Sequence, residues 1–204
     1  LSASMAVTLA PAASADSTAP QRWVATSGTD TNNDCTTEAS PCATIQHAVD
    51  EATAGDVINV AAGNYAESVT VNKSLTIEGP NAGISPNTGD PLVVNSGRAA
   101  EAVVKPTSAD GDHAFKLVTG AADVAITGMT VDLADAITYA TGVSKGQAYL
   151  AASNSTPNAR LSLTNNIFEH ADWVSNGSLW YHNSATGVAI TVDSNRFAGA
   201  RNTS

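Results

Sequence analysis

Apolar residues follow a helical period in one clear stretch of the 204-residue chain. Between Thr44 and Thr53 they recur at i, i+3, i+4 and i+7, which places them on one face of an amphipathic helix. These apolar residues are Ile45, Ala48, Val49 and Ala52. Thr44 is suited to cap the first turn, and Gly55 is suited to end the helix. The pattern therefore predicts a short helix at 44–53.

After Gly55 the apolar positions alternate with polar or small ones, which is the period of a half-buried strand. The alternating pairs are Ile58 with Val60, Val69 with Val71, and Leu75 with Ile77. An earlier strand is expected at 22–26, followed by a polar loop at 27–41. No Asn-Gly or Asp-Gly pair joins two matched strands, so simple hairpins are not favoured.

The second half of the chain repeats a unit of short strands closed by a polar turn. Phe197 follows Phe168 by 29 residues, and Tyr149 follows Phe115 by 34 residues. Repeats of roughly 20–50 residues are typical of solenoids, in which each unit buries its inner face only against its neighbours. The repeat therefore predicts stacked parallel strands across residues 56–198.

Two asparagines hold equivalent turns of this repeat. Asn166 lies two residues before Phe168, and Asn195 lies two residues before Phe197. Stacked Asn side chains can hydrogen-bond from one unit to the next, and Asn tolerates the left-handed backbone conformation of tight turns. We interpret both residues as structural rather than catalytic.

Composition and charge narrow the class of protein. Charged residues make up only 14% of the chain and aromatic residues 5%, a mixture that suits short strands and many turns. The formal net charge is −10 and the sequence pI is about 4.5, so the chain should repel phosphate backbones and anionic membrane surfaces. Nucleic-acid binding is therefore not expected. No apolar run reaches the roughly 18 residues of a transmembrane span.

The N-terminal residues resemble the remnant of a secretory signal peptide at 1–15. A short apolar run at 5–10 precedes Ala13-Ser14-Ala15, which fits cleavage before Asp16. Residues 16–22 are then expected to be a linker, and 23–204 a single domain. The last residues, 198–204, offer no apolar face to cover an open end, so we expect further C-terminal units or domains. The expected location is outside the cell, secreted or on the surface.

Two cysteines, Cys35 and Cys42, stand in the polar loop. In an exported protein a disulfide between them is the expected state, closing a loop of 8 residues. Two cysteines alone would make an incomplete metal site.

The stretch from Ala43 to Gly79 carries a family resemblance. It contains Ala43-Thr44-Ile45-Gln46, Gly55-Asp56, Lys73-Ser74-Leu75-Thr76-Ile77 and Gly79. It resembles the opening of pectin-lyase-like right-handed parallel β-helices, in which an amphipathic helix caps the first round, and the polar loop at 28–34 fits the same pattern. The resemblance implies an all-β fold, a single-stranded right-handed parallel β-helix with an N-terminal capping helix. That superfamily includes lyases, esterases, polygalacturonases, phage tailspikes and adhesins, so it does not fix an activity.

The densest group of chemically useful side chains lies at 169–173, with two aromatic residues a short distance downstream. Carboxylate, imidazole and indole groups near one turn can contact a sugar, whereas the same aromatic rings can instead pack beneath a loop. The candidate glycan-binding residues are Glu169, His170, Asp172, Trp173, Trp180 and Tyr181.

A weaker motif for calcium lies in the polar loop. Asp30, Asn32 and Asp34 offer oxygen ligands at alternate positions, as a calcium loop does. An EF-hand would need Gly at the sixth position and Glu at the twelfth, where Cys35 and Pro41 stand. Asp and Asn also form ordinary turns, so no cofactor is required and calcium is an option only.

The catalytic motifs of the resembled family are not recognisable, and catalytic residues remain unknown. One hypothesis is a secreted or cell-surface β-helix protein that binds a polysaccharide or another surface partner without catalysis. The alternative is a polysaccharide-processing enzyme, pectate lyase-like or glycoside hydrolase-like, whose catalytic rounds lie beyond Ser204.

Overall fold

The described residues form three parallel sheets. The computed structural model describes residues 19–90, 93–106, 113–132, 148–154, 156–169, 179–183 and 186–198. Every pairing between named strands in these ranges is parallel, as the repeat predicted. None of the helices in these ranges has the length and apolar character needed to span a bilayer.

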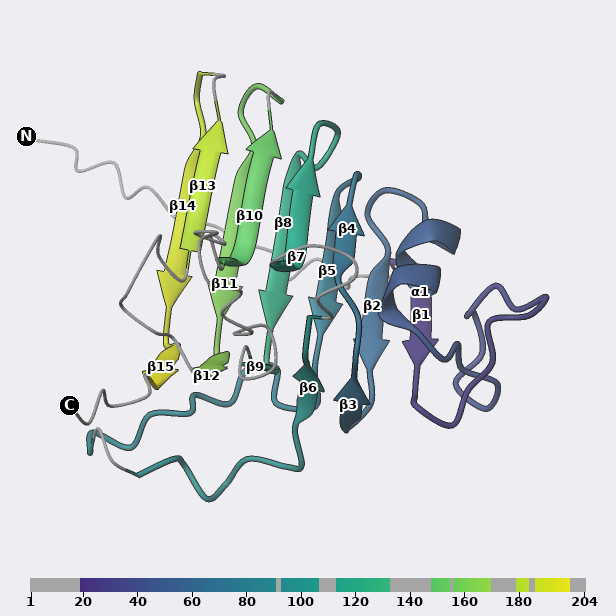
Figure 1. Cartoon of the computed structure of the whole chain (residues 1–204), viewed down its shortest axis with the longest axis horizontal. Helices are drawn as coiled ribbons and strands as arrows, with labels where there is room; N and C mark the ends of the chain where they lie inside the picture. The colour runs from purple at the N-terminus through teal and green to yellow at the C-terminus, as the bar shows by residue number, and fades with distance from the viewer. Residues whose placement is uncertain are drawn as a thin grey trace, which may run out of the picture.

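Each sheet gathers strands from along the whole described chain (Figure 1). Sheet 1 contains β1 (Gln21–Val24), β2 (Val57–Val60), β5 (Leu75–Glu78), β8 (Asp123–Thr127), β11 (Arg160–Thr164) and β14 (Ala189–Asp193). Sheet 2 contains β3 (Gly63–Tyr65), β6 (Ala102–Val104), β9 (Thr130–Asp132), β12 (Ile167–Glu169) and β15 (Arg196–Ala198). Sheet 3 contains β4 (Val69–Val71), β7 (His113–Val118), β10 (Ala148–Asn154) and β13 (Leu179–Asn183). From β2 onward the chain visits sheets 1, 2 and 3 in a fixed rotation.

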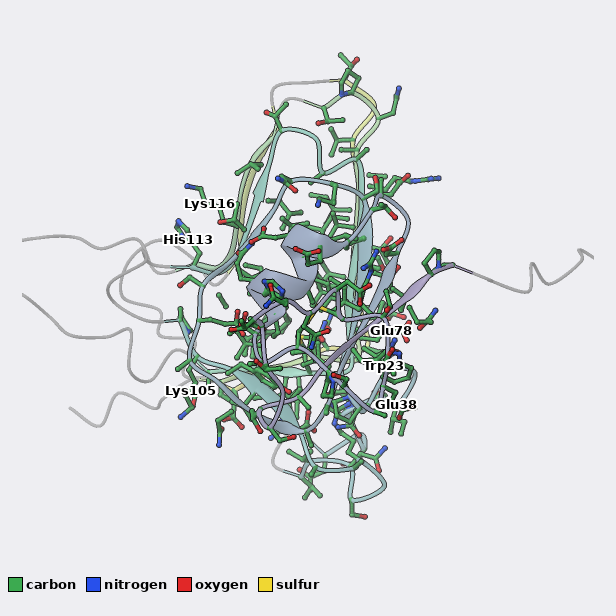
Figure 2. All side chains as sticks on the ribbon, turned by 90° about the vertical axis from the view of Figure 1, so that its right-hand side faces the viewer. Trp23, Glu38, Glu78, Lys105, His113 and Lys116 are labelled. Atoms are coloured by element: carbon green, nitrogen blue, oxygen red, sulfur yellow. A yellow bond between two sulfur atoms is a disulfide. The ribbon has the colours of Figure 1, made fainter. Side chains whose placement is uncertain are left out.

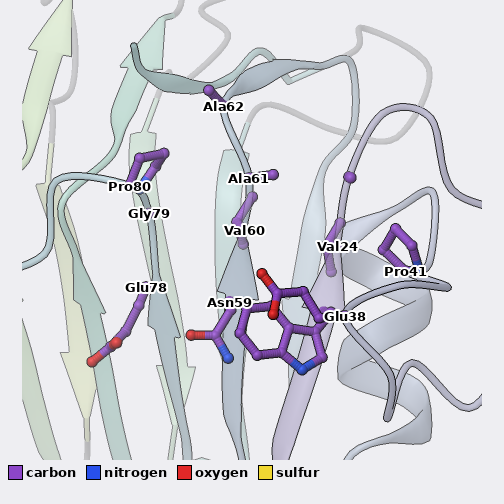
Figure 3. A pocket seen from close by; sticks show the side chains of 12 residues that line it. Val24, Glu38, Pro41, Asn59, Val60, Ala61, Ala62, Glu78, Gly79 and Pro80 are labelled. Atoms are coloured by element: carbon purple, nitrogen blue, oxygen red, sulfur yellow. The ribbon is translucent and has the colours of Figure 1, made fainter. Parts of the chain in front are cut away.

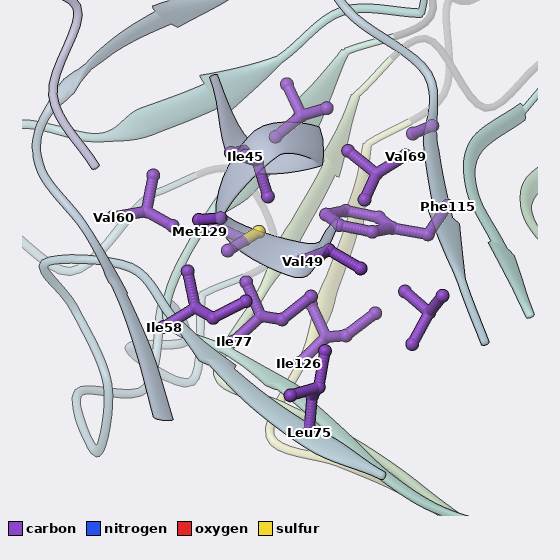
Figure 4. Close-up of a cluster of buried hydrophobic side chains, with 14 of the residues drawn as sticks. Ile45, Val49, Ile58, Val60, Val69, Leu75, Ile77, Phe115, Ile126 and Met129 are labelled. Atoms are coloured by element: carbon purple, nitrogen blue, oxygen red, sulfur yellow. The ribbon is translucent and has the colours of Figure 1, made fainter. Parts of the chain in front are cut away.

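The core lies on the inner faces of these sheets, where branched apolar side chains align from strand to strand. Strand pairing places Ile58, Ile77 and Ile126 in one row, and each is almost fully buried. Phe115 reaches the same interior from β7 (Figure 4). Parallel register thus turns the alternation seen in the sequence into continuous internal rows.

One helix, α1 (Ile45–Glu51), lies beside β1 and β2 at one end of sheet 1, close to where the sequence predicted it (Figure 1). The Thr44 side chain accepts a hydrogen bond from the His47 backbone N–H, which confirms the expected cap. The helix ends earlier than expected, and Gly55 does not end it. Instead the Lys73 ammonium donates to the backbone oxygens of Val49 and Ala52, satisfying carbonyls that lack helical partners.

The asparagine turns between sheets 1 and 2 are confirmed as structural links. Asn166 is fully buried, its Nδ2 donates to the Ile126 backbone oxygen at 2.8 Å, and its Oδ1 accepts from the Met129 N–H. Asn195 repeats the arrangement by donating to the backbone oxygen of Leu163 at 2.7 Å.

The expected left-handed conformation, however, falls one residue earlier. Gly128, Asn165 and Ser194 have φ of 71°, 58° and 54° in three equivalent turns. In each turn the residue that reverses the chain has the positive φ. In the two later turns the next residue, Asn166 or Asn195, donates its side-chain amide to the backbone of the preceding unit.

A long segment between β5 and β6 runs along the ends of the sheet 2 strands toward β15 (Figure 1). Within it, Arg98 is paired with Glu101 at 2.7 Å and donates to the Asn165 backbone oxygen. Further along, the Asn87 amide donates to the Asn195 backbone oxygen at 3.1 Å. The segment therefore ties successive turns together.

Candidate functional site

A groove opens on the outer face of sheet 1 where β1, β2 and β5 lie side by side (Figure 3). Its volume is about 430 Å³. Its polar and aromatic lining comes from four residues, Trp23, Glu38, Asn59 and Glu78. The remaining wall is backbone and small or apolar side chains.

Strand alternation and register bring three of these residues into one row. Val24, Val60 and Ile77 point into the core, so the residues beside them face outward. Trp23 pairs with Asn59, and Asn59 pairs with Glu78. Because adjacent strands lie about 4.8 Å apart, the row spans roughly 10 Å, the scale of two sugar rings.

The fourth residue, Glu38, comes from the loop closed by the disulfide. Cys35 and Cys42 are bonded as predicted, with their Cα atoms 5.1 Å apart. The loop is fixed against β1 because Trp23 N–H donates to the Cys35 oxygen and Cys42 N–H donates to the Trp23 oxygen. The disulfide loop thus forms one side of the groove and holds Glu38 over the strand row.

The groove leaves several polar groups open to a ligand. The Asn59 Nδ2 donates to Gln21 Oε1 at 2.7 Å and to the Arg22 backbone oxygen, which fixes the amide and directs its oxygen toward β5 (Figure 3). Glu38, Glu78 and the Trp23 indole N–H have no hydrogen-bond or ion-pair partner among the described residues. Two carboxylates and the Asn59 amide oxygen, all hydrogen-bond acceptors, therefore line the groove together with the half-buried Trp23 ring. The indole N–H of that ring is the donor.

The only cationic side chain on β1 is committed elsewhere. Arg22 pairs with Asp56 at 2.9 Å and donates to the Asp34 backbone oxygen. Burial, the largest influence, raises the pKa of Asp56, but hydrogen bonds from Thr53 and the Arg22 guanidinium together bring that pKa below its ordinary value. Arg22 consequently does not neutralise the carboxylates of the groove.

A second hollow of about 360 Å³ lies on the same face, farther along sheet 1. Its floor is a row of small residues in parallel register, Thr76, Ala125, Ser162 and Thr191. Arg160 and Asp123 form an exposed ion pair at its rim. Both hollows use the outer face of β5, so sheet 1 presents an extended surface across its strands.

The glycan-binding residues predicted from the sequence fall on other parts of the molecule. Glu169 ends β12 in sheet 2, paired in register with Asp132. Trp180 and Tyr181 lie in β13 of sheet 3, where they pair with Ala151 and Ala152. His170, Asp172 and Trp173 lie outside the described residues. This group stays a prediction.

The predicted calcium residues line a polar hollow of about 570 Å³ beside α1, together with His47 and Glu51. Asp30 accepts hydrogen bonds from the Ala43 and Thr44 N–H groups and from the Thr44 hydroxyl, and Asp34 accepts from Thr36. Burial raises the pKa of Asp30, but these hydrogen bonds outweigh it and lower the pKa overall. Calcium here stays a prediction, in a loop whose carboxylates already have protein partners.

Sequence reasoning missed Trp23, Glu38, Asn59 and Glu78. The alternation of apolar and polar residues around Val24, Val60 and Ile77 could have identified the neighbouring residues as outward-facing. It could not show which of these residues lie side by side, because that depends on the register between strands.

Comparison of this chain with protein-family models, with curated proteins and with solved structures found no match in any of the three.

Proposed function

We propose that this protein is a secreted or cell-surface right-handed parallel β-helix that binds a polysaccharide without cleaving it, through the groove lined by Trp23. The observation that carries the proposal is the row of Trp23, Asn59 and Glu78, with Glu38 above it. An aromatic ring beside unpaired polar groups fits a sugar, which presents both an apolar C–H face and polar hydroxyl groups.

The strand rotation supports the β-helix. From β2 to β15 the chain repeats sheets 1, 2 and 3 without an exception among the described strands. Parallel strands joined by crossovers are right-handed in nearly all proteins, which favours that hand here. The helix α1 contacts β1, β2 and β4, as a cap over the first round would.

Sugar chemistry supports the choice of ligand. The apolar C–H face of a pyranose can pack on the exposed part of the Trp23 indole, which is amphipathic in the same way. Hydroxyl groups can donate to Glu38 and Glu78 and accept from the indole N–H. A few fixed polar groups beside an apolar wall are typical of small-molecule sites.

The disulfide supports the location. Disulfides persist mainly in oxidising compartments outside the cytosol. Cys35 and Cys42 form one, and together with the signal-like segment at 1–15 they favour export.

Affinity measurements with a panel of neutral, acidic and amino polysaccharides test the proposal. We expect saturable binding of at least one, reduced about tenfold or more in Trp23→Ala. Phe197→Ala is the matched control, since it removes an exposed aromatic side chain from the far end of the chain. Binding of no polysaccharide, or equal binding by Trp23→Ala, would overturn it. Release of new reducing ends or unsaturated products would favour the polysaccharide-processing alternative.

A further inference from the structure

The charged side chains that line the groove are all acidic. Glu38 and Glu78 both line it, and neither has an ion-pair partner among the described residues. No Lys, Arg or His contributes to its lining. Figure 2 shows Trp23, Glu38 and Glu78 on one side of the molecule, whereas Lys105, His113 and Lys116 lie on the opposite side.

The two arginines on the strands of sheet 1 are each paired with a carboxylate, so their positive charge is largely offset. Arg22 is held by Asp56, and Arg160 at the second hollow is held by Asp123 at 2.6 Å. The chain as a whole adds to the field with a net charge of −10. A uronic acid polymer would therefore bring its carboxylates toward unpaired carboxylates, which disfavours its binding.

We infer that the Trp23 groove selects a glycan with free amino groups, an amino-sugar polymer, over neutral and acidic glycans. An ammonium group can contact Glu38 or Glu78 while it faces the ring of Trp23, and aromatic faces attract cations. A neutral sugar would use the ring and the hydroxyl contacts alone. This inference rests on the proposed function and specifies its ligand.

The test compares three oligosaccharides of equal length: one of glucosamine, one of N-acetylglucosamine and one of galacturonic acid. Calorimetry at mildly acidic pH and low salt keeps the amines charged and the interaction unscreened. We expect the glucosamine oligomer to bind about tenfold more tightly than its acetylated counterpart, with the galacturonate oligomer weakest. Added salt should reduce the preference for the amine.

Substitutions of the two glutamates test whether they cause the preference for the glucosamine oligomer. Glu38→Gln and Glu78→Gln should each weaken binding of the glucosamine oligomer several-fold and leave the acetylated oligomer nearly unchanged. Asp193→Asn is the matched control, because Asp193 lies in the same row as Glu78 but on β14. The control should bind like the wild type.

The two proposals fail in different ways. Equal or weaker binding of the glucosamine oligomer, with Trp23→Ala still reducing affinity for the others, would overturn the selectivity and leave polysaccharide binding in place. Binding of none of the three oligomers, nor of the wider panel, would overturn polysaccharide binding itself.

Discussion

At the scale of single residues, three equivalent turns place three different residues at the position with positive φ. Gly128, Asn165 and Ser194 all adopt positive φ. At Gly128 the backbone of Asn81 and Ala82 lies directly where a Cβ would project. Asn and Ser suffice in the later turns, but only glycine allows the segment after β5 to approach so closely.

Gly128→Ala should therefore be far more damaging than an alanine at an open left-handed glycine. We expect a loss of roughly 3 kcal/mol or more, from backbone overlap added to φ strain. Gly55→Ala is the control, since Gly55 has φ of 97° with no atom near its Cβ position, and it should cost about 1 kcal/mol. Denaturant unfolding measures both, and equal losses would contradict the close approach.

The ion pair between Arg22 and the buried Asp56 gives a prediction for pH. Its carboxylate is 1% exposed and has a lowered pKa, against an ordinary value of 3.8. Because the folded-state pKa of Asp56 is lowered, its carboxylate stabilises the fold fully at pH values above the unfolded-state pKa. This stabilisation is lost as the pH falls through the folded-state pKa. Asp56→Asn should thus cost roughly 3 kcal/mol at neutral pH, and progressively less below about pH 4.

Unfolding free energies of the wild type and Asp56→Asn, measured from neutral to acidic pH, check this. Burial raises the pKa of Glu67, so its own pH effect runs in the opposite direction, but it is common to both proteins. A difference that stays constant with pH would show that Asp56 does not titrate as described.

At the scale of elements, the disulfide loop links stability to the groove. Replacing Cys35 and Cys42 by Ser removes a constraint on a loop of 8 residues, worth about 2.5 kcal/mol in the chain-entropy model. The loop carries Glu38, so affinity for the glucosamine oligomer should fall as well. Unfolding and calorimetry of the double variant test both effects, and a variant as stable and as tight-binding as the wild type would exclude this role.

Elements set by local pattern were predictable, and those set by distant pairing were not. The helix near Ile45 and the strands around Ile58 and Ile77 follow from alternation within a few residues. The row of Trp23, Asn59 and Glu78 depends on register between strands far apart in the sequence. The cysteines predicted a closed loop, but not that it would lie beside Trp23.

At the scale of the whole molecule, the two ends of the described sheets differ. At one end α1 buries Ile45, Ala48 and Val49 against the first strands. At the other end Ile190 and Val192 hold core positions in β14, in register with Leu161 and Leu163, yet are 48% and 46% exposed. An uncovered row of core residues on an edge strand favours association.

The 204-residue chain should therefore self-associate as its concentration rises. Ile190→Lys or Val192→Lys should reduce association, because each places a charge on the exposed core row. Thr191→Lys is the control on the outer face of the same strand and should associate like the wild type. Size exclusion with light scattering measures this, and a wild-type chain that stays monomeric at high concentration would contradict it.

The central claim, that a glycan binds against Trp23, can be tested with a single spectroscopic signal. The chain has three tryptophans, and Trp173→Phe with Trp180→Phe leaves Trp23 as the only one. Titrating this double variant with the glucosamine oligomer should change the Trp23 emission saturably, with the same Kd as calorimetry gives. Calorimetric binding without any change in Trp23 emission, or loss of binding in the double variant, would place the glycan elsewhere and contradict the claim.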